Sequence, residues 1–168
     1  NSDEAMAEVQ YTNGDENTTS GKLRNANGHV KPWKVKFWSI GNEMYGDWQL
    51  GHMSTDQFVK KNNEFADRMR SADPSIKLVT VGDVGDWDQM VLANCSEKMD
   101  YISEHFYKGD YNHGGGLMTH VKQITDAIRE KAVAHREYRN SIPALKGKDI
   151  RICMDEWNYW YGPQPYGE

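Results

Sequence analysis

Residues 35–49, VKFWSIGNEMYGDWQ, show how this chain of 168 residues is organised. Their first part, residues 35–40, is rich in β-branched and aromatic side chains, which favours a short strand, and Gly41 closes it. Asn42 and Glu43 follow immediately. Apolar runs that end beside polar side chains recur further along the chain, and this repetition predicts a sheet whose strands end at a common edge.

Three further runs predict strands at residues 76–81, 101–107 and 150–154. Segments with a helical pattern lie between them, so strand and helix alternate along the chain. This order favours an α/β fold with a parallel sheet. Residues 12–30 are polar and rich in Asn and Gly, and we expect a loop or a long connection there.

The helices between these strands are predicted from caps and from apolar spacing. Ser54 and Gln57 form a capping box, and the helix that they begin should end at Asp73, before a proline. A weaker helix is predicted around residues 87–94. Apolar side chains at spacings of four, three, four and four then indicate a long amphipathic helix: Leu117, Val121, Ile124, Ile128 and Ala132.

Composition excludes several classes of function. The formal charge is −5, from 20 Lys and Arg against 25 Asp and Glu, which disfavours nucleic acid or an anionic membrane as a partner. No apolar run approaches the roughly 20 residues of a membrane span, and the N-terminus has no signal-peptide pattern. Cys95 and Cys153 show no metal or redox spacing, and Cys153, in the run IRICM, is expected to be a buried small hydrophobe. Cytoplasmic and secreted origins both stay open.

Two carboxylates mark the candidate site. Glu43 follows the first predicted strand and Glu156, beside Asp155, follows the last. His105 and Tyr107 end the strand between them, two residues apart and therefore on one face. Taken alone, a glutamate after a strand is usually a solvated loop residue, and a single histidine is usually structural. In a parallel sheet, however, side chains just past the strand ends face the ligand together, so these residues are expected to converge.

Such a pair of carboxyl groups suits glycoside hydrolysis. One group must be protonated to assist the leaving oxygen, and the other must be ionised to attack or to activate water. A separation of about 5–5.5 Å would allow direct attack with retention of configuration. Asn42 could then donate to the 2-hydroxyl of the sugar, and Tyr107 could donate to the ionised nucleophile and hold it in place.

Four strings carry a resemblance to a known family: WSIGNEMYGDWQLGHM, DPSIKLVTVG, ISEHFY and MDEWNYWYG. Together they resemble the α-L-arabinofuranosidases of glycoside hydrolase family 51, from about Glu4 to the end of the chain. The resemblance implies a partial (β/α)8 TIM barrel. Residues 1–168 would form an incomplete catalytic barrel domain with about strands 4–7 and their helices, preceded by the helix after strand three. Strands 1–3, strand 8 and a C-terminal β-sandwich would be absent.

The resemblance also implies roles for individual residues. Glu43 matches the general acid/base and Glu156 the nucleophile, 113 positions apart. Asn42 matches the sugar-binding residue before the acid, and Tyr107 matches the tyrosine that bonds to the nucleophile. The other substrate-binding residues implied are Trp160 as an aromatic wall, His105 as a supporting polar residue and Trp48 on the aglycone side. No metal and no cofactor are implied. The expected partners are arabinose-containing glycans, and the parent protein is expected to be a homo-oligomer.

Other interpretations remain beside this one. Another retaining glycosidase of the same clan, such as a xylosidase or glucanase, would share the two glutamates, although the segment GDWQLGHM after Glu43 favours the arabinofuranosidase. An inactive carbohydrate-binding fragment would not need the intact pair of Glu43 and Glu156. Because an unclosed sheet exposes edges and apolar surface, we expect residues 1–168 alone to be poorly soluble and inactive.

Overall fold

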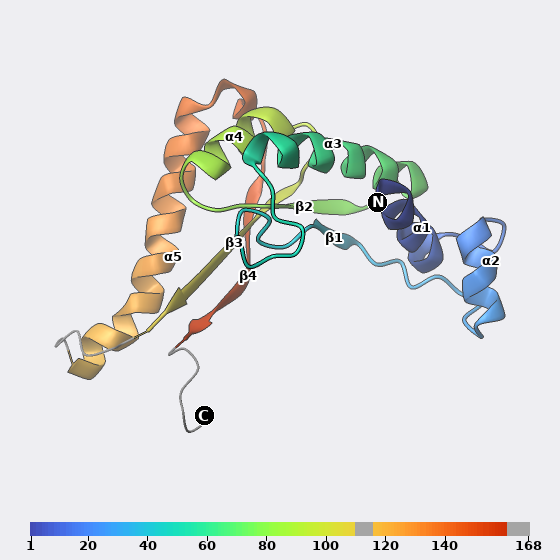
Figure 1. The fold of residues 1–168 in the computed structure, drawn as a ribbon, viewed down its shortest axis with the longest axis horizontal. Coiled ribbons are helices and arrows are strands. Elements are labelled where there is room, and N and C mark those ends of the chain that lie inside the picture. The colour runs from blue at the N-terminus through green and yellow to red at the C-terminus, as the bar shows by residue number, and fades with distance from the viewer. Residues whose placement is uncertain (110–115, 161–168) are drawn as a thin grey trace.

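The structure is a computed structural model that describes residues 1–109 and 116–160 (Figure 1). Helices and strands alternate through most of it. In chain order the elements are α1 (Ser2–Asn13), α2 (Thr19–Ala26), β1 (Phe37–Ile40), α3 (Thr55–Ala72), β2 (Lys77–Val81), α4 (Asp86–Cys95), β3 (Tyr101–Lys108), α5 (Gly116–Ser141), the short 3₁₀ helix η1 (Pro143–Leu145) and β4 (Arg151–Tyr159).

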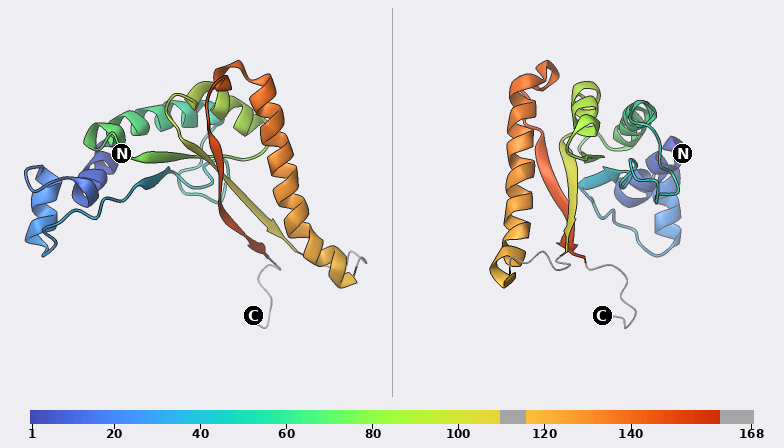
Figure 2. Two further views of the ribbon diagram at one scale, coloured as in Figure 1. Left: turned by 180° about the vertical axis from the view of Figure 1, so that it is seen from behind. Right: turned by 60° about the vertical axis from the view of Figure 1, so that its left-hand side comes forward.

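The four strands form one sheet in the order β1-β2-β3-β4, and each neighbouring pair is parallel. The predicted parallel α/β sheet is therefore confirmed. Helices α3, α4 and α5 follow one another as an arch along one side of this sheet, and the two further views in Figure 2 show the same arrangement. In these views, helices α3, α4 and α5 lie on one side of the sheet only.

The predicted helices are confirmed, and their caps explain where they begin and end. The Ser54 side chain accepts from the backbone of Gln57 and the Gln57 side chain accepts from the backbone of Ser54, which completes the capping box of α3. Phe58 and Met69 are buried on one face of that helix. Helix α4 covers the weaker prediction at residues 87–94.

The prediction of a loop at residues 12–30 is wrong in part, because α1 extends to Asn13 and α2 occupies Thr19–Ala26. An unusual contact stabilises this polar segment. The Arg24 guanidinium is fully buried and donates to four backbone carbonyls, those of Tyr11, Gly14, His29 and Val30, at 2.6–3.1 Å. These hydrogen bonds to one charged side chain stabilise the segment in place of an apolar face. The sequence prediction missed the helix because it relied on apolar periodicity.

Two further predictions need correction. Strand β4 runs to Tyr159, so Glu156 lies inside a strand rather than after it. The predicted apolar stripe of α5 is not the buried face of the helix: Leu117, Val121 and Ile128 are 75%, 50% and 42% exposed. The buried residues of α5 are Ala127, His135 and Tyr138. The first turns of α5 meet the sheet only at its far end, where the Tyr159 hydroxyl of β4 donates to the carbonyls of His120 and Val121.

The core lies between the sheet and the arch of helices. Its larger cluster joins Val91 and Leu92 of α4 with Ile102 of β3 and Tyr138 of α5. Cys95 belongs to it, whereas Cys153 is only partly buried, which corrects the expectation for that residue. Within residues 1–109 and 116–160, no helix combines the length and the apolar character needed to cross a membrane.

Candidate active site

A β-bulge brings two neighbouring carboxylates of β4 to the same face of the sheet. Glu104 of β3 pairs with Met154, but the next residue, His105, pairs with Glu156, so Asp155 is an extra residue in β4. Regular alternation would send Asp155 and Glu156 to opposite faces. The bulge re-aims them, as bulges near active sites do.

The face of β3 that meets these carboxylates carries Ser103, His105 and Tyr107. The Ser103 hydroxyl donates to Asp155 Oδ1 at 2.7 Å, and the Tyr107 hydroxyl donates to Glu156 Oε1 at 2.8 Å. The expected contact between Tyr107 and Glu156 is therefore present. Both strands hold polar side chains on their open, concave side.

Glu43 reaches the same place from the turn after β1. Its backbone has φ of +46°, in the left-handed region that is uncommon for a residue with a side chain. The preceding Gly41, with φ of +86°, allows the chain to reverse there. Backbone conformations of this kind cost free energy and are concentrated at functional sites. This turn aims the Glu43 carboxylate at β3.

His105 lies at the centre of the assembled group. Its Nδ1 is 3.0 Å from Glu43 Oε1 and 3.5 Å from Glu156 Oε2. One side-chain nitrogen or oxygen atom from each of these three residues lies within 4.8 Å of the other two. The His105 Nε2 is 3.1 Å from Asp155 Oδ1 on its other side. The His105 side chain is 7% exposed and that of Glu156 is 38% exposed, so the group is buried at His105 and accessible to solvent at Glu156.

Hydrogen-bond donors set the charge state of Glu43. Burial raises its pKa, but donation from His105, Trp48 and Gln49 outweighs burial and holds the pKa below its ordinary value. The Trp48 indole donates to Glu43 Oε2 at 2.7 Å. The hydrogen bond to Glu156 raises the pKa of the Tyr107 hydroxyl, which therefore stays protonated as a donor.

The remaining predicted residues surround this group. Asn42 is exposed on the turn that carries Glu43. Trp48 is 66% exposed, and its indole directly contacts Glu43. Trp160 is 60% exposed and packs edge-on against Tyr107, with 5.8 Å between the ring centroids. The binding roles of all three stay predictions.

Sequence reasoning missed Ser103 and the contacts of Asp155. A signal existed for Ser103, because it lies two residues before His105 and so shares its face. No comparable sequence signal indicates the bulge that places Asp155 on the same face as Glu156.

Two groups in the described residues could offer donor atoms to a metal ion. One is Glu43, His105 and Glu156; the other is Asp88, Glu104 and His135, on the opposite face of β3. In the second group Lys131 Nζ already lies 2.6 Å from Glu104 and supplies a positive charge. The expectation of no metal and no cofactor stays a prediction.

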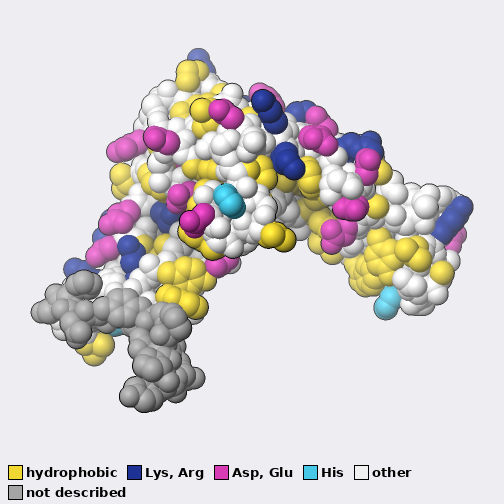
Figure 3. Space-filling model, viewed as in Figure 1, with side chains coloured by type: hydrophobic (Ala, Val, Ile, Leu, Met, Phe, Trp, Pro, Cys, Tyr) yellow, Lys and Arg dark blue, Asp and Glu magenta, His cyan; other side chains and the backbone are white. Residues whose placement is uncertain are grey.

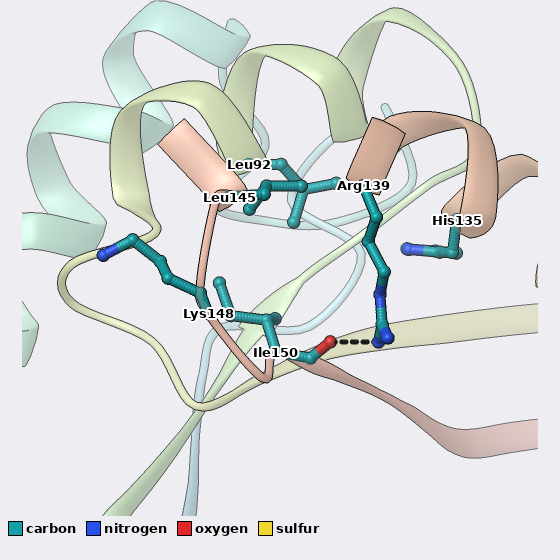
Figure 4. A pocket seen from close by; sticks show the side chains of 6 residues that line it. All are labelled: Leu92, His135, Arg139, Leu145, Lys148 and Ile150. Carbon is teal, nitrogen blue, oxygen red and sulfur yellow. Dashed lines mark hydrogen bonds between the residues drawn. The ribbon is translucent and has the colours of Figure 1, made fainter. Parts of the chain in front are cut away.

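A small cavity behind the sheet offers no alternative site. It lies between α4, η1 and the start of β4, where Arg139 donates to the Ile150 carbonyl (Figure 4). Its volume of about 10 Å³ has room for at most a single water. This cavity is therefore too small for a sugar.

Comparison with known proteins gives a consistent result. Residues 1–129 match the family model of the α-L-arabinofuranosidase 1 domain. The intracellular exo-α-(1→5)-L-arabinofuranosidase 1 of Bacillus subtilis is 34% identical over 95% of this chain and 33% of its own length. The corresponding enzyme of Bifidobacterium longum is 32% identical over 94% of this chain and 30% of its own length. The chain thus spans about a third of the length of these curated relatives.

Solved structures agree with this result. The α-L-arabinofuranosidase of Thermotoga maritima, in complex with arabinose, superposes with a TM-score of 0.87 at 34% identity, over 98% of this chain and 33% of that one. The family 51 enzyme of Thermotoga petrophila gives a TM-score of 0.86 at 35% identity, with the same coverage. The family model, the relatives and the fold agree, and the chain belongs to the α-L-arabinofuranosidases of glycoside hydrolase family 51.

Proposed function

We propose that the full-length protein containing this chain is a retaining glycoside hydrolase that releases terminal α-L-arabinofuranosyl groups from arabinose-containing polysaccharides or oligosaccharides. The observation that carries the proposal is the convergence of Glu43 and Glu156, from segments far apart in the sequence, to within 4.8 Å. Inverting glycosidases need about 6.5–9.5 Å between their carboxyl groups to admit a water molecule, whereas retaining ones need about 5–5.5 Å. One oxygen of each carboxyl group within 4.8 Å of the other favours the shorter separation and so supports retention.

The reaction proceeds in two halves. Glu156 attacks the anomeric carbon as Glu43 gives its proton to the departing glycosidic oxygen, which leaves a covalent arabinofuranosyl ester on Glu156. Glu43, now ionised, then takes a proton from water, and the resulting hydroxide oxygen displaces Glu156. Tyr107 supports the ionised form of Glu156 by donating to it at 2.8 Å.

The charge state of Glu43 suits the second half directly. Its lowered pKa favours the carboxylate, which is the form that acts as a base. The first half needs the protonated form. When a sugar fills the open side of the site, it removes water from Glu43, and desolvation raises the pKa of a carboxyl group. Substrate binding therefore supplies the shift that the acid role requires.

Three side chains around the pair are proposed to bind the sugar. Asn42 donates to the 2-hydroxyl, Trp160 forms an aromatic wall beside Tyr107, and Trp48 lies towards the leaving group. The exposure of the two indole rings, 60% and 66%, leaves large apolar faces available for contact.

We further propose that residues 1–168 correspond to about strands 4–7 of a (β/α)8 barrel. Sequential parallel strands with their helices on one side are typical of that fold. The β1 side of the sheet is apolar: Val35 and Phe37 are exposed, and a hollow of about 310 Å³ is lined by Ile40, Met44 and Phe58. Hydrophobic side chains also gather on the surface near α2 (Figure 3). Further barrel strands would cover such a surface.

Two alternatives stay open to the same experiment. Structures of a family 39 β-xylosidase and a family 44 endoglucanase share the fold at 16% and 12% identity, which carries no information on substrate. A carbohydrate-binding protein without activity is the other alternative. The partners proposed for the full-length enzyme are arabinose-containing glycans and further copies of itself.

The test uses the full-length protein with 4-nitrophenyl α-L-arabinofuranoside. We expect turnover of about 1–10³ s⁻¹, far slower release from the β-D-xyloside, and loss of activity on every substrate in Glu156→Ala. In dilute methanol the product should be methyl α-L-arabinofuranoside, because two inversions restore the configuration. The β-anomer, or a preference for xyloside, would contradict the proposal. Residues 1–168 alone should be inactive.

A further inference from the structure

A second charged cluster lies directly behind the active site, on the helix-covered face of β3. It consists of Asp88 from α4, Glu104 from β3, and Lys131 and His135 from α5. Asp88 and Glu104 are fully buried, and the side chains of His135 and Lys131 are 7% and 12% exposed. We refer to these four residues as the rear cluster. Ionisable groups are rarely buried so completely unless they are paired.

Each member of the rear cluster has a partner on another element. Glu104 Oε2 accepts from Lys131 Nζ at 2.6 Å, and Glu104 Oε1 lies 2.6 Å from His135 Nε2. The same His135 nitrogen lies 3.3 Å from Asp88 Oδ2. Asp88 Oδ1 accepts from the backbone N–H of Asp83, just after β2. The cluster therefore joins the middle of β3 to two helices and to the end of the neighbouring strand.

Stability alone does not account for the rear cluster. The desolvation cost of a buried ion pair can exceed its Coulomb gain, and well-packed apolar side chains at such sites often give equal or greater stability. What charged pairs add is direction, because each bond fixes an angle as well as a distance. The relevant question is which part of the molecule needs that direction.

The position of Glu104 answers it. Glu104 lies between Ser103 and His105, whose side chains belong to the active site, and the register between β3 and β4 breaks between Glu104 and His105. Strand pairing is interrupted at a bulge, so it constrains the strand less firmly there. Anchoring Glu104 at two oxygens holds the rotation of β3 where the sheet itself is weakest.

Close packing around the anchor leaves the strand little freedom. A Cβ atom on Gly82 would lie 2.3 Å from the Ser103 carbonyl oxygen and 2.9 Å from Asp88 Oδ1. Only glycine fits between these two atoms. A change in the tilt of β3 would therefore be transmitted to Ser103 and His105 rather than absorbed by empty space.

We propose that Glu104 is a positioning residue: through Lys131 and His135 it fixes the orientation of β3, so that His105 reaches both Glu43 and Glu156. Its consequence for turnover rests on the proposed function. Its consequence for the geometry of His105 does not. The two can therefore be measured separately.

The experiment compares Glu104→Gln with Asp100→Asn in the full-length protein. Asp100 is a matched control, because it also binds two cations, Arg70 and Lys77, but at the opposite end of β3 from the active site. Glu104→Gln should lower kcat for the aryl arabinofuranoside by about 10–100-fold with little change in KM, the size expected when a reacting group is misplaced by about 1 Å. Asp100→Asn should lower the thermal midpoint and leave kcat unchanged.

The second readout needs no activity. The ring signals of His105 in an NMR spectrum, assigned with His105→Gln, should shift in Glu104→Gln and stay in place in Asp100→Asn. If the wild type has no turnover, the proposed function fails while these signals still decide the role of Glu104. If Glu104→Gln does not fold, Glu104→Asp keeps the charge, shortens the reach and is judged by the same two readouts. Unchanged kcat and unchanged His105 signals, or equal losses in both variants, would overturn the proposal.

Discussion

The two faces of β3 carry the same chemical groups in opposite surroundings. On the open face His105 lies between Glu43 and Glu156, and on the covered face His135 lies between Asp88 and Glu104. Glu156 is 38% exposed, whereas Asp88 and Glu104 are fully buried. Only the covered group has a lysine, Lys131, to balance its charge. In the roles proposed above, a histidine between two carboxylates serves chemistry on the accessible face and structure on the buried face.

Burial also changes the charge states of the two groups. Burial, together with the nearby Glu104, raises the pKa of Asp88 to about 7, although His135 acts in the opposite direction. Glu43, in contrast, has a lowered pKa because donors surround it at an open site. The open group therefore offers a carboxylate near neutral pH, while Asp88 and His135 of the covered group hold their protons more tightly than usual. Substitutions on each face should separate these behaviours.

The largest effect is expected from Glu43→Ala on the open face. Substrates with poor leaving groups, such as arabino-oligosaccharides, should lose about 10²–10⁴-fold in kcat/KM, the usual contribution of a general acid. The aryl arabinofuranoside should lose far less in its first half-reaction, because its leaving group needs no proton.

Azide provides the control for that experiment. Added to Glu43→Ala with the aryl substrate, it should restore turnover and give an arabinofuranosyl azide of retained configuration. Equal losses on both substrates, or no rescue, would count against Glu43 as the acid/base.

On the covered face, His135→Gln should change how stability depends on pH. Burial lowers the pKa of His135, but the facing carboxylates of Asp88 and Glu104 outweigh burial and raise it from 6.5 to about 9. A raised pKa means that the folded state binds the proton more tightly than the unfolded state. The resulting stabilisation, about 3 kcal/mol, is complete below pH 6.5 and is lost as the pH rises through about 9.

Thermal midpoints between pH 6 and 10 measure this effect. Asp88 faces His135 and, with a pKa of about 7, is ionised over most of this range, while burial raises the pKa of Tyr138 above its ordinary value near 10. The difference in thermal midpoint between wild type and His135→Gln should therefore become smaller as the pH approaches 9. His52→Gln, in an exposed loop, is the control and should give a constant gap. A gap for His135→Gln that does not narrow would show that His135 is uncharged in the folded state.

A smaller effect is expected from Tyr107→Phe on the open face. The variant keeps the ring against Trp160 and removes the donor to Glu156, leaving the ionised nucleophile less stable and less well oriented. Because Tyr107 is 43% exposed, water replaces part of the lost bond, and we expect about a 10-fold loss of kcat. Tyr101→Phe, on the same face at the start of β3, should leave kcat unchanged. A loss confined to KM would indicate that Tyr107 binds the sugar instead.

The contrast between the two faces also explains what could be read from the sequence. Glu43, His105 and Tyr107 were predictable because strand ends of a parallel sheet share an edge and alternate residues share a face. Their contacts with Glu156 depend on the bulge at Asp155. The sequence of β4 alone does not show where such an extra residue lies.

The rear cluster could not be predicted for a different reason. Glu104 interrupts an apolar strand face, and its partners come from helices whose rotation about their own axes is set only by packing. Helix α2 was missed for a related reason, since its neighbourhood is held by one buried arginine, Arg24, rather than by an apolar stripe. Local patterns predicted the elements, whereas contacts between charged groups on different elements required the structure.

The smallest effect is expected from Trp48→Phe, which tests the donor balance on the open face. The variant keeps an aromatic ring and removes the N–H that donates to Glu43 at 2.7 Å. Losing one of the donors that lower the pKa of Glu43 must raise that pKa. Because the general acid works in its protonated form, the alkaline limb of the profile of kcat/KM against pH should move to higher pH.

The size of this change is limited by solvent. Trp48 is 66% exposed, so water can replace its N–H, and the plateau of kcat/KM should fall by less than about 10-fold. Trp33→Phe is the matched control: Trp33 is 49% exposed, but its ring packs against Tyr11 and His29, near α1 and α2. The alkaline limb of the pH profile should stay in place in Trp33→Phe. An alkaline limb that moves to lower pH in Trp48→Phe would mean that Trp48 does not support the carboxylate of Glu43. The low pKa of Glu43 would then be due to His105 and Gln49.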